Sequence, residues 1–495
     1  MTAPPLHQSY AAAVPELSVP HRADAPPAAR LVFLNEPLAV ELGFDPDWLR
    51  SPAGISLLTG QTTNTDAHTE PAPVTTAQAY AGYQFGQPSP SLGDGRAVLL
   101  GDLVDTRGVQ RDLHLKGPGR TPFSRPGADG KAPLGPMLRE AVIGEALHGL
   151  GIPTTRALAV LTTGERIQPR RGITPEPGAL LVRVASSHLR VGTFEYAAWH
   201  HRIDVRRALL DYVIDLHYPQ ARGTEIPALA VLGSVMRAQA GLIAQWMLVG
   251  FVHGVMNTDN MALSGESIDF GPCAFLDEHR TGAVFSSIDR GGRYAYGKQP
   301  GIALWNLSRF AEALLQLIDP NDPGRAVDAA TAVLERFEPL YLDAFARGMA
   351  VKLGIPIASG SSSTSGAADL AAVRTLGEGL LAAMDEQRVD HTGFFRALAE
   401  GAPAPFDHWQ ERLDALRGSG PATDAAREAM TGANPIYIPR NAQLERALCA
   451  AELGDLTAVE QIIDAVRSPF TRRPGLEHLE APGEGADQFV TFCGT

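Results

Sequence analysis

The chain has 495 residues, more than a single hydrophobic core usually contains, so its length predicts two or more packed subdomains. Apolar residues make up 44% and charged residues 20%, values that exclude a wholly disordered chain. The formal net charge of −13 argues against general binding to nucleic acids or anionic membranes, because their phosphate groups repel a negative surface.

Three cysteines are too few for a disulfide scaffold, which fits a reducing compartment. Residues 1–5 lack the basic and apolar regions of a signal peptide, so the sequence predicts a cytoplasmic protein. The longest apolar run, Gly241 to Met256, is interrupted by Gln245 and His253 and is expected to be too short to span a membrane. We therefore expect a soluble monomer without a nucleic-acid or membrane partner.

The pattern of elements predicts an α+β protein in four parts. Residues 1–79 are rich in Pro and Ala and indicate an N-terminal extension. Residues 80–185 combine short strands with one strong helix, as in a small β-rich lobe. Residues 186–350 carry longer helical periods and the polar motifs of a larger helical lobe. Residues 351–495 begin with a Gly- and Ser-rich loop and continue as a helical extension with a cysteine-containing tail.

Two strands of the small lobe carry polar motifs. Closely spaced glycines in Gly93-Asp94-Gly95-Arg96 let backbone amides approach a phosphate, although a plain hairpin turn explains the same residues. In the next strand, alternation places Leu113 and Leu115 in the core and His114 with Lys116 on the opposite face. If that face lines a cleft, Lys116 reaches a nucleotide phosphate. The alternative is a solvated surface charge.

Two further segments supply charges to the same lobe. A helix expected from near Pro136 to near Gly149 holds Glu140 and Glu145. Residues five apart on a helix point about 140° away from each other, so only one of these acids can face Lys116. Arg183 alternates with apolar residues in a strand, and its guanidinium suits either a phosphate or a structural salt bridge.

The most specific motif is residues 253–260, His-Gly-Val-Met-Asn-Thr-Asp-Asn, followed by Asp269-Phe270-Gly271. The order matches the catalytic loop and D-F-G segment of a protein kinase. However, Val255 stands where the kinase loop has its aspartate, which argues against ordinary phosphoryl transfer. We expect His253 to brace the loop through hydrogen bonds.

The segment 261–268 is expected to form two short strands around a Ser-Gly turn, which would return Asp269 to Asn260. Their oxygens suit Mg²⁺, which needs few protein ligands because phosphate and water supply the others. An ordinary polar hairpin is the alternative. Three acids beyond this segment are expected to be solvated charges: Asp277, Glu278 and Asp289.

Taken in order, these motifs resemble the selenoprotein O (SelO) family, also called YdiU. The matching segments are residues 80–86, 93–96, 115–125, 183–190, 253–260 and 434–441. The resemblance implies a protein-kinase-like bilobal fold with N-terminal and helical C-terminal extensions. It also implies a protein adenylyltransferase that binds ATP inverted relative to kinases and transfers AMP to Ser, Thr or Tyr hydroxyls of protein substrates.

The resemblance also implies a role for each site residue. Asp259 would accept the proton, Lys116 and Glu140 would pair, and Asn260 with Asp269 would ligate Mg²⁺ or Mn²⁺. The residues implied in ATP binding are Gly93, Gly95, Arg96, Lys116, Asp129, Gly130, Arg183, Arg190 and Asp269, with Arg183 and Arg190 on the γ-phosphate. Cys273 and Cys493 would form a redox-controlled disulfide. The alternative is two unpaired thiols.

Two other hypotheses remain open. One is a phosphotransferase of the kinase fold, against which Val255 counts. The other is a pseudokinase that binds nucleotide without catalysis. Lys116, Glu140, Asn260 and Asp269 together count against that hypothesis.

Overall fold

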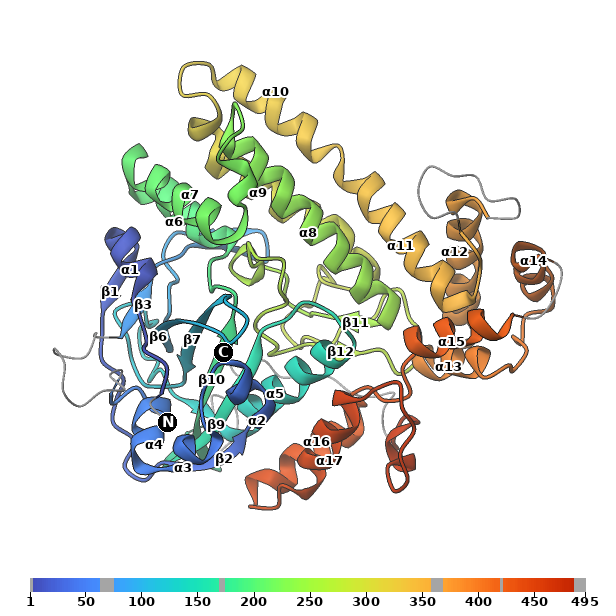
Figure 1. Cartoon of the computed structure of the whole chain (residues 1–495), viewed down its shortest axis with the longest axis horizontal. Helices are drawn as coiled ribbons and strands as arrows, with labels where there is room; N and C mark the ends of the chain where they lie inside the picture. The colour runs from blue at the N-terminus through green and yellow to red at the C-terminus, as the bar shows by residue number, and fades with distance from the viewer. Residues whose placement is uncertain (1–2, 63–74, 169–173, 358–367, 419–421, 485–495) are drawn as a thin grey trace.

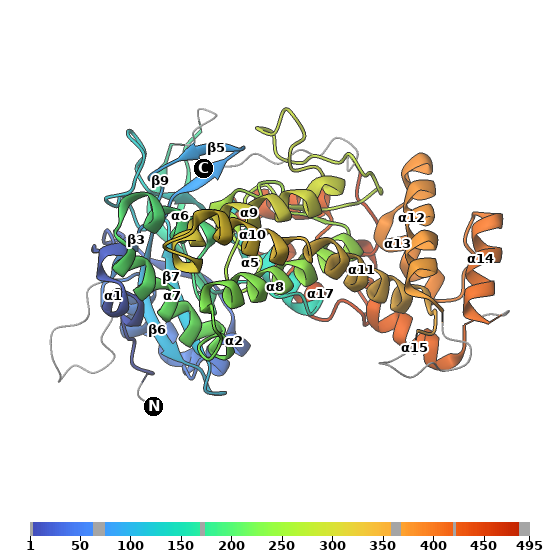
Figure 2. The same ribbon diagram turned by 90° about the horizontal axis from the view of Figure 1, so that it is seen from above.

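The computed structural model describes residues 3–62, 75–168, 174–357, 368–418 and 422–484. The fold is a mixture of helices with a mainly antiparallel sheet, as the α+β class predicted. The sheet lies at one end of the molecule and helices α12 to α15 lie at the other (Figures 1 and 2). The long helices between them connect the two ends.

The main sheet has the strand order β1-β3-β6-β7-β10-β9-β2, and β8 pairs with β10. Every pairing is antiparallel. Residues 1–79 supply three of these strands, so the predicted N-terminal extension and small lobe share one sheet. The strands are β1 (Ser18–Pro20), β2 (Arg30–Leu34), β3 (Thr76–Gln78), β6 (Ala97–Val104), β7 (Gln110–Lys116), β8 (Ala132–Pro133), β9 (Arg156–Ile167) and β10 (Glu176–Ala185).

One face of the sheet packs against the short N-terminal helices α2 (Glu36–Glu41), α3 (Pro46–Arg50) and α4 (Pro52–Leu58). Leu113 and Leu115 point into this core, as the alternation of β7 predicted. The face that carries His114 and Lys116 is also buried, so Lys116 is not a solvated surface charge. That face meets α5 (Leu134–Gly149), which packs on β9 and β10.

Helix α8 (Pro227–Val249) lies in the predicted larger lobe and packs against α9 (Gln299–Ile318) and α11 (Phe337–Leu353). Both α8 and α9 lie within residues 186–350, where the sequence predicts longer helical periods. The remaining helices of this lobe are α6 (Val191–His200), α7 (Ile203–His217) and α10 (Pro323–Leu334), and α1 (Ser9–Ala13) contacts α7. The short strands β11 (Phe251–Val252) and β12 (Ala274–Phe275) flank the predicted catalytic segments.

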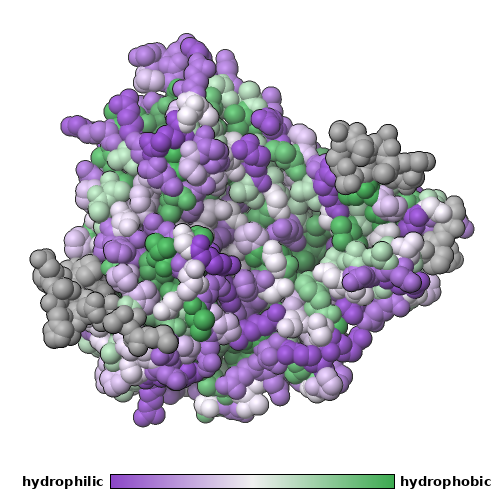
Figure 3. All heavy atoms as spheres, in the orientation of Figure 1, coloured by the Kyte–Doolittle hydropathy of each residue, from purple (hydrophilic) through white to green (hydrophobic). Residues whose placement is uncertain are grey.

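By length and composition alone α8 could cross a membrane, which the apolar run in the sequence was not expected to do. Its most apolar window is 67% buried inside the protein, as in a core helix. The helix begins 14 residues before the apolar run Gly241 to Met256 and ends at Val249, before His253, so its bounds differ from those of the run. On the face shown in Figure 3, hydrophobic and hydrophilic residues are mixed.

The C-terminal extension consists of α12 (Leu370–Gln387), α13 (His391–Ala399), α14 (Asp407–Arg417), α15 (Asp424–Ala433), α16 (Asn441–Glu452) and α17 (Thr457–Arg467). Helices α16 and α17 of the predicted helical extension are separated at Gly454, whose φ of 101° suits glycine. Helices α16 and α17 return to the sheet end and pack on α5. The two halves of the chain are thereby joined near the predicted site.

We predict that Leu49→Ala lowers the free energy of unfolding by about 2–5 kcal/mol, because the cavity lies in the core between α3 and the sheet. The matched control Leu453→Ala removes a leucine that is 91% exposed and is expected to change stability by less than about 0.5 kcal/mol. Urea unfolding of both variants measures the difference. Equal stabilities would mean that the N-terminal helices are not part of the sheet's core.

Candidate active site

Lys116 stands at the end of β7 and bonds to acids from two other segments. Its Nζ lies 2.6 Å from Oε2 of Glu140 on α5 and 3.0 Å from Oδ1 of Asp269. Glu145 points elsewhere and accepts hydrogen bonds from Arg156 and Arg467. The helical geometry of α5 therefore predicted correctly that only one of its two acids faces Lys116.

Three cations converge on Asp269. Besides Lys116, Nη1 of Arg183 lies 2.6 Å from Oδ1, and Nη1 of Arg190 lies 3.4 Å from Oδ2. Arg183 also reaches Oε1 of Glu140 at 3.2 Å. Although burial favours the neutral acid, Lys116, Arg183 and Arg190 hold the pKa of the Asp269 carboxyl well below its usual value. Asp269 is therefore ionised at neutral pH.

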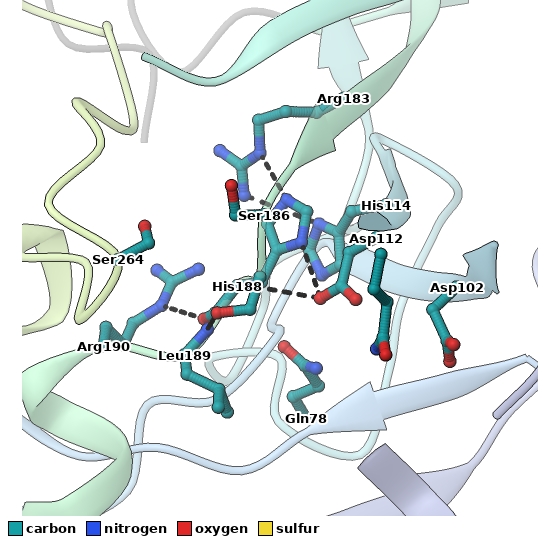
Figure 4. Close-up of polar contacts among 12 residues, drawn as sticks. Gln78, Asp102, Asp112, His114, Arg183, Ser186, His188, Leu189, Arg190 and Ser264 are labelled. Carbon is teal, nitrogen blue, oxygen red and sulfur yellow. Dashed lines mark hydrogen bonds and ion pairs between the residues drawn. The ribbon is translucent and has the colours of Figure 1, made fainter. Parts of the chain in front are cut away.

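Two stacked histidines fix the guanidinium of Arg183 (Figure 4). The rings of His114 and His188 lie 4.2 Å apart. Nε of Arg183 donates to Nε2 of His188 at 3.2 Å, while Nδ1 of His188 lies 3.3 Å from Oδ2 of Asp112. Burial lowers the pKa of both imidazoles, so each is neutral and can accept a hydrogen bond from the arginine.

Asp94 joins the glycine-rich loop to this network. Its Oδ2 lies 3.0 Å from Nε2 of His114 and accepts a hydrogen bond from the backbone of Gln78. We had not predicted roles for His188, Asp94 or Asp112. The alternation of His114 and Lys116 on one face of β7 was the only signal in the sequence that pointed to this side of the sheet; the register that sets Arg183 opposite His114 is a feature of the structure.

The glycines of the predicted nucleotide loop pack closely against residues 121–124. Gly93 has a φ of 60°, and an added Cβ would lie 2.3 Å from the ring of Phe123. A Cβ at Gly95 would lie 3.0 Å from the carbonyl oxygen of Phe123. Arg96 is half-buried, Asp129 is exposed and bonds to the backbone of Lys131, and Gly130 is buried against Gly119. Nucleotide contact by these residues stays a prediction.

Asp259 lies in the 3₁₀ turn η3 (Thr258–Asn260) and is 9% exposed. Its backbone carbonyl accepts a hydrogen bond from Arg190 at 2.8 Å, but its Oδ1 has no hydrogen-bond partner among the described residues. Burial raises the pKa of the Asp259 carboxyl to about 6. An acid with this pKa can accept a proton near neutral pH.

A hairpin covers Asp259. It consists of β4 (Gly82–Gln84) and β5 (Gln87–Ser89), joined by Phe85 and Gly86 with φ angles of 53° and 80°. The backbone of Tyr83 donates to Oγ1 of Thr258, and the backbone of Phe85 donates to Oδ1 of Asn257. A Cβ at Gly82 would lie 2.7 Å from Oδ1 of Asp259, so glycine permits this close approach.

Glu195 is a further acid beside Asp259 that the sequence did not lead us to expect. Its Oε2 accepts a hydrogen bond from Thr258 at 2.7 Å, and its Oε1 has no partner in the described part of the chain. Burial raises the pKa of the Glu195 carboxyl to about 7. The signal in the sequence was a single acid within the apolar segment 191–199.

His253 braces the segment before Asp269, as predicted: its ring lies 2.8 Å from the carbonyl oxygen of Ile268. The predicted hairpin over residues 261–268 is wrong. Ala262 instead forms a bridge with Arg190, and Ser267 forms one with Thr154. Other segments thus supply the backbone partners that a self-paired hairpin would have used, and Asp269 takes a left-handed φ of 62°.

The residues present suit a divalent metal ion bound together with phosphate. The amide nitrogen of Asn260 donates to the carbonyl of Val255 at 2.9 Å, which leaves the amide oxygen as a ligand, and Asp269 is ionised. Within the described ranges, no group of three or more His, Cys, Asp or Glu residues could hold a metal by itself. Such a small donor set fits Mg²⁺, which takes most of its ligands from phosphate and water.

Two of the acids expected to be solvated are buried. Asp277 bonds to Arg440 at 3.1 Å and to Asn441 at 3.0 Å, so residues distant in sequence satisfy its charge. Asp289 accepts hydrogen bonds from the backbone of residues 293 and 294. Glu278, in contrast, is partly exposed, with 35% of its side-chain surface accessible. The contacts of Asp277 join segments that are distant in sequence, and those of Asp289 form within a loop. Sequence periodicity predicts neither kind of contact.

Cys273 is buried, and its Sγ lies 3.3 Å from the carbonyl oxygen of Phe270. Cys493 lies outside the described residues. The disulfide between them stays a prediction.

We predict that Glu140→Ala lowers the free energy of unfolding by about 3–5 kcal/mol, because it leaves Lys116 and Arg183 with fewer buried counter-charges. The control Asp343→Ala breaks an exposed pair with Arg347 and is expected to cost at most about 1 kcal/mol. Chemical denaturation without nucleotide compares the two variants. A Glu140 variant as stable as the control would show that the cluster is not held by this carboxylate.

The comparisons with known proteins agree with one another. The family model described as protein adenylyltransferase SelO matches residues 7–418. A protein nucleotidyltransferase YdiU from Mycolicibacterium smegmatis is 50% identical over 498 residues, covering 99% of this chain and 98% of the relative. Proteins of the same name from Pseudarthrobacter chlorophenolicus and Cereibacter sphaeroides are 48% and 51% identical, with 98% and 95% of this chain covered and 97% and 95% of theirs.

These matches extend over the segments that supply Lys116, Glu140, Arg183, Asp259 and Asp269. The identities are high and span nearly whole chains, so the resemblance suggested by the motifs is confirmed at the level of the family. The chain belongs to the SelO family of nucleotidyltransferases.

Proposed function

We propose that this protein transfers AMP from ATP to the hydroxyl groups of Ser, Thr or Tyr side chains in other proteins, with ATP inverted relative to kinases. The observation that carries the proposal is the position of the buried carboxylate. Val255 replaces the aspartate of a kinase loop, whereas Asp259, four residues later, has an unpartnered Oδ1 and a pKa of about 6. A base displaced along the loop suits a reaction at a different phosphorus atom.

We also propose that the fold is protein-kinase-like and bilobal. Its support is the contact between a strand lysine, Lys116, and a helix glutamate, Glu140, on the sheet side of the site. The loop with Asp259 and the segment with Asp269 supply the opposite side. ATP would bind between these two groups of residues.

The charges of the site favour a triphosphate. Among the described residues, the three cations Lys116, Arg183 and Arg190 form ion pairs with two carboxylates, Glu140 and Asp269. Phosphate oxygens can therefore accept hydrogen bonds from these cations while the cations keep their positions. Each charge-assisted bond stabilises the complex with ATP by about 1.5–3 kcal/mol. Donors fixed before the substrate arrives need no reorganisation as charge develops in the transition state.

In the proposed reaction, the hydroxyl oxygen of the acceptor forms a bond to the α-phosphorus while the bond between that phosphorus and the bridging oxygen breaks. Pyrophosphate leaves with the electron pair, and Oδ1 of Asp259 takes the hydroxyl proton. Arg183 and Arg190 would hold the departing phosphates. Asn260 and Asp269 would hold Mg²⁺, which supplies additional neutralisation of phosphate charge when bound.

One experiment separates this proposal from the phosphotransferase and the pseudokinase. The protein is incubated with acceptor proteins and with ATP labelled on either the α- or the γ-phosphate, and the products are examined by intact mass. Label from the α-phosphate and the mass of AMP are expected. A phosphate mass with γ-label would identify a phosphotransferase, and no addition at all would identify a pseudokinase.

We predict that Asp269→Ala abolishes AMP transfer, because it removes the carboxylate on which Lys116, Arg183 and Arg190 converge. In contrast, Asp259→Ala is expected to lose transfer while it retains ATP binding, because Asp259 contacts this group of cations only through its backbone carbonyl, which accepts a hydrogen bond from Arg190. Isothermal titration with ATP and the labelled transfer assay measure both variants. Unimpaired transfer by the Asp269 variant would contradict the assignment.

We predict that kcat/KM for AMP transfer falls as pH decreases below about 6, because Asp259 becomes protonated and can no longer accept a proton. The decrease approaches about tenfold per pH unit, whereas the rate levels off above this pKa. The control Glu195→Gln removes the neighbouring group with a pKa of about 7 and should keep the acid limb, that is, the decrease in kcat/KM below pH 6. A limb that disappears in this control would assign the titration to Glu195 instead.

A further inference from the structure

Aromatic side chains gather on the hairpin side of Asp259. Tyr83 on β4 lies 5.6 Å from the ring of Trp199 on α6 and 5.4 Å from that of Trp305 on α9, both in edge-to-face contact. Trp199 is 39% exposed, and the other two rings are half-buried. Together with Arg293 and Arg309, described next, these residues form what we call the aromatic–arginine surface.

Two guanidinium groups lie over these rings. Cζ of Arg293 is 4.6 Å from the centre of the Trp305 ring, and Cζ of Arg309 is 5.3 Å from the same ring. Arg309 has an acidic partner, Glu312, at 2.7 Å. In the described part of the chain Arg293 forms no ion pair with an acid, and its Nε and Nη2 are buried without a hydrogen-bond acceptor. The positive charge of Arg293 is therefore not offset by a paired carboxylate, which favours a negatively charged partner.

This surface is continuous with the proposed base. Tyr83 follows Gly82, which touches the Asp259 carboxylate, and the backbone of Tyr83 bonds to Thr258. Arg293 lies beside the turn of the same hairpin, because a Cβ at Gly86 would be 3.5 Å from its Cζ. A segment bound here would lie next to the carboxylate that is to take its hydroxyl proton.

The composition of the surface favours a protein partner. Trp, Tyr and Arg are the residues most enriched where protein partners bind tightly, since they offer large contact areas together with hydrogen-bond donors. The nucleotide phosphates have three other cations, Lys116, Arg183 and Arg190. In a protein with a net charge of −13, the two guanidinium groups over Trp305 place positive charge on this surface and favour a negatively charged group there.

We propose that the aromatic–arginine surface binds the acceptor as an extended segment that carries an Asp or Glu near the modified hydroxyl. The inference rests on the proposed AMP transfer and specifies its substrate class. The carboxylate bonds to Arg293, with Arg309 adding positive charge, while the segment packs on Tyr83 and Trp305. The acceptor hydroxyl then lies at Asp259.

The test uses synthetic peptide pools with one central Ser, Thr or Tyr and with Glu, Ala or Lys at the flanking positions. Transfer from α-labelled ATP gives kcat/KM for each pool. We expect the Glu pools to exceed the Ala pools by about tenfold in the unmodified protein, the gain of one charge-assisted contact. Arg293→Gln is expected to remove this preference without a change in the KM for ATP.

Two further variants make the result independent of folding. Arg293→Glu is expected to shift the preference from Glu pools to Lys pools, a gain that a damaged fold does not produce. Arg222→Gln changes an exposed arginine with acidic partners of its own and should keep the original preference.

Three outcomes would overturn the inference while leaving AMP transfer in place. They are equal rates for the Glu, Ala and Lys pools, modification of folded proteins but of no peptide, and a higher KM for ATP in Arg293→Gln with the peptide preference intact. The last would mean that the surface binds nucleotide. Failure to transfer AMP to any peptide or protein would instead overturn the proposed function on which the inference rests.

Discussion

The structure of the site depends on the convergence of Lys116, Arg183 and Arg190 on the single carboxylate of Asp269. Each of the four side chains comes from a different segment, so the contact fixes β7, β10, the start of α6 and the segment before β12 relative to one another. When no ATP is bound, these cations repel each other at close range, and the carboxylate of Asp269 offsets that repulsion. Asp269 adopts a strained, left-handed φ, and this backbone conformation brings its carboxylate to the three cations.

Around this centre, neutral groups orient the charged ones. His114 and His188 are held by acids on one side and accept hydrogen bonds from Arg183 on the other. Because burial keeps both imidazoles neutral, they accept hydrogen bonds from the arginine and fix its direction without adding positive charge that would repel the guanidinium. Asp259 lies outside this group of ion pairs, which explains why its carboxyl has a raised pKa while that of Asp269 is lowered.

The sequence predicted best where a local period determines direction. Alternation in β7 gave the face of Lys116, and the helical period of α5 allowed only one of Glu140 and Glu145 to face it. The family resemblance selected Glu140 and supplied the remaining candidate residues. Contacts between distant segments could not be predicted this way. Asp277 was expected in solvent because its partner Arg440 lies 163 residues away, and the three-residue strands β1 and β3 are too short for an alternation pattern.

The link between Asp277 and the C-terminal extension sets the smallest unit that can keep this site intact. The family model ends at residue 418, yet the side chain of Asn441 bonds to the backbone of Phe275 in β12, shortly after Asp269. Arg440 is fully buried and neutralises Asp277 and Asp390 together. A fragment cut at residue 418 would leave the buried Asp277 and the half-buried Asp390 without their counter-ion, so the segment that matches the family model is shorter than the length of chain that holds this site together.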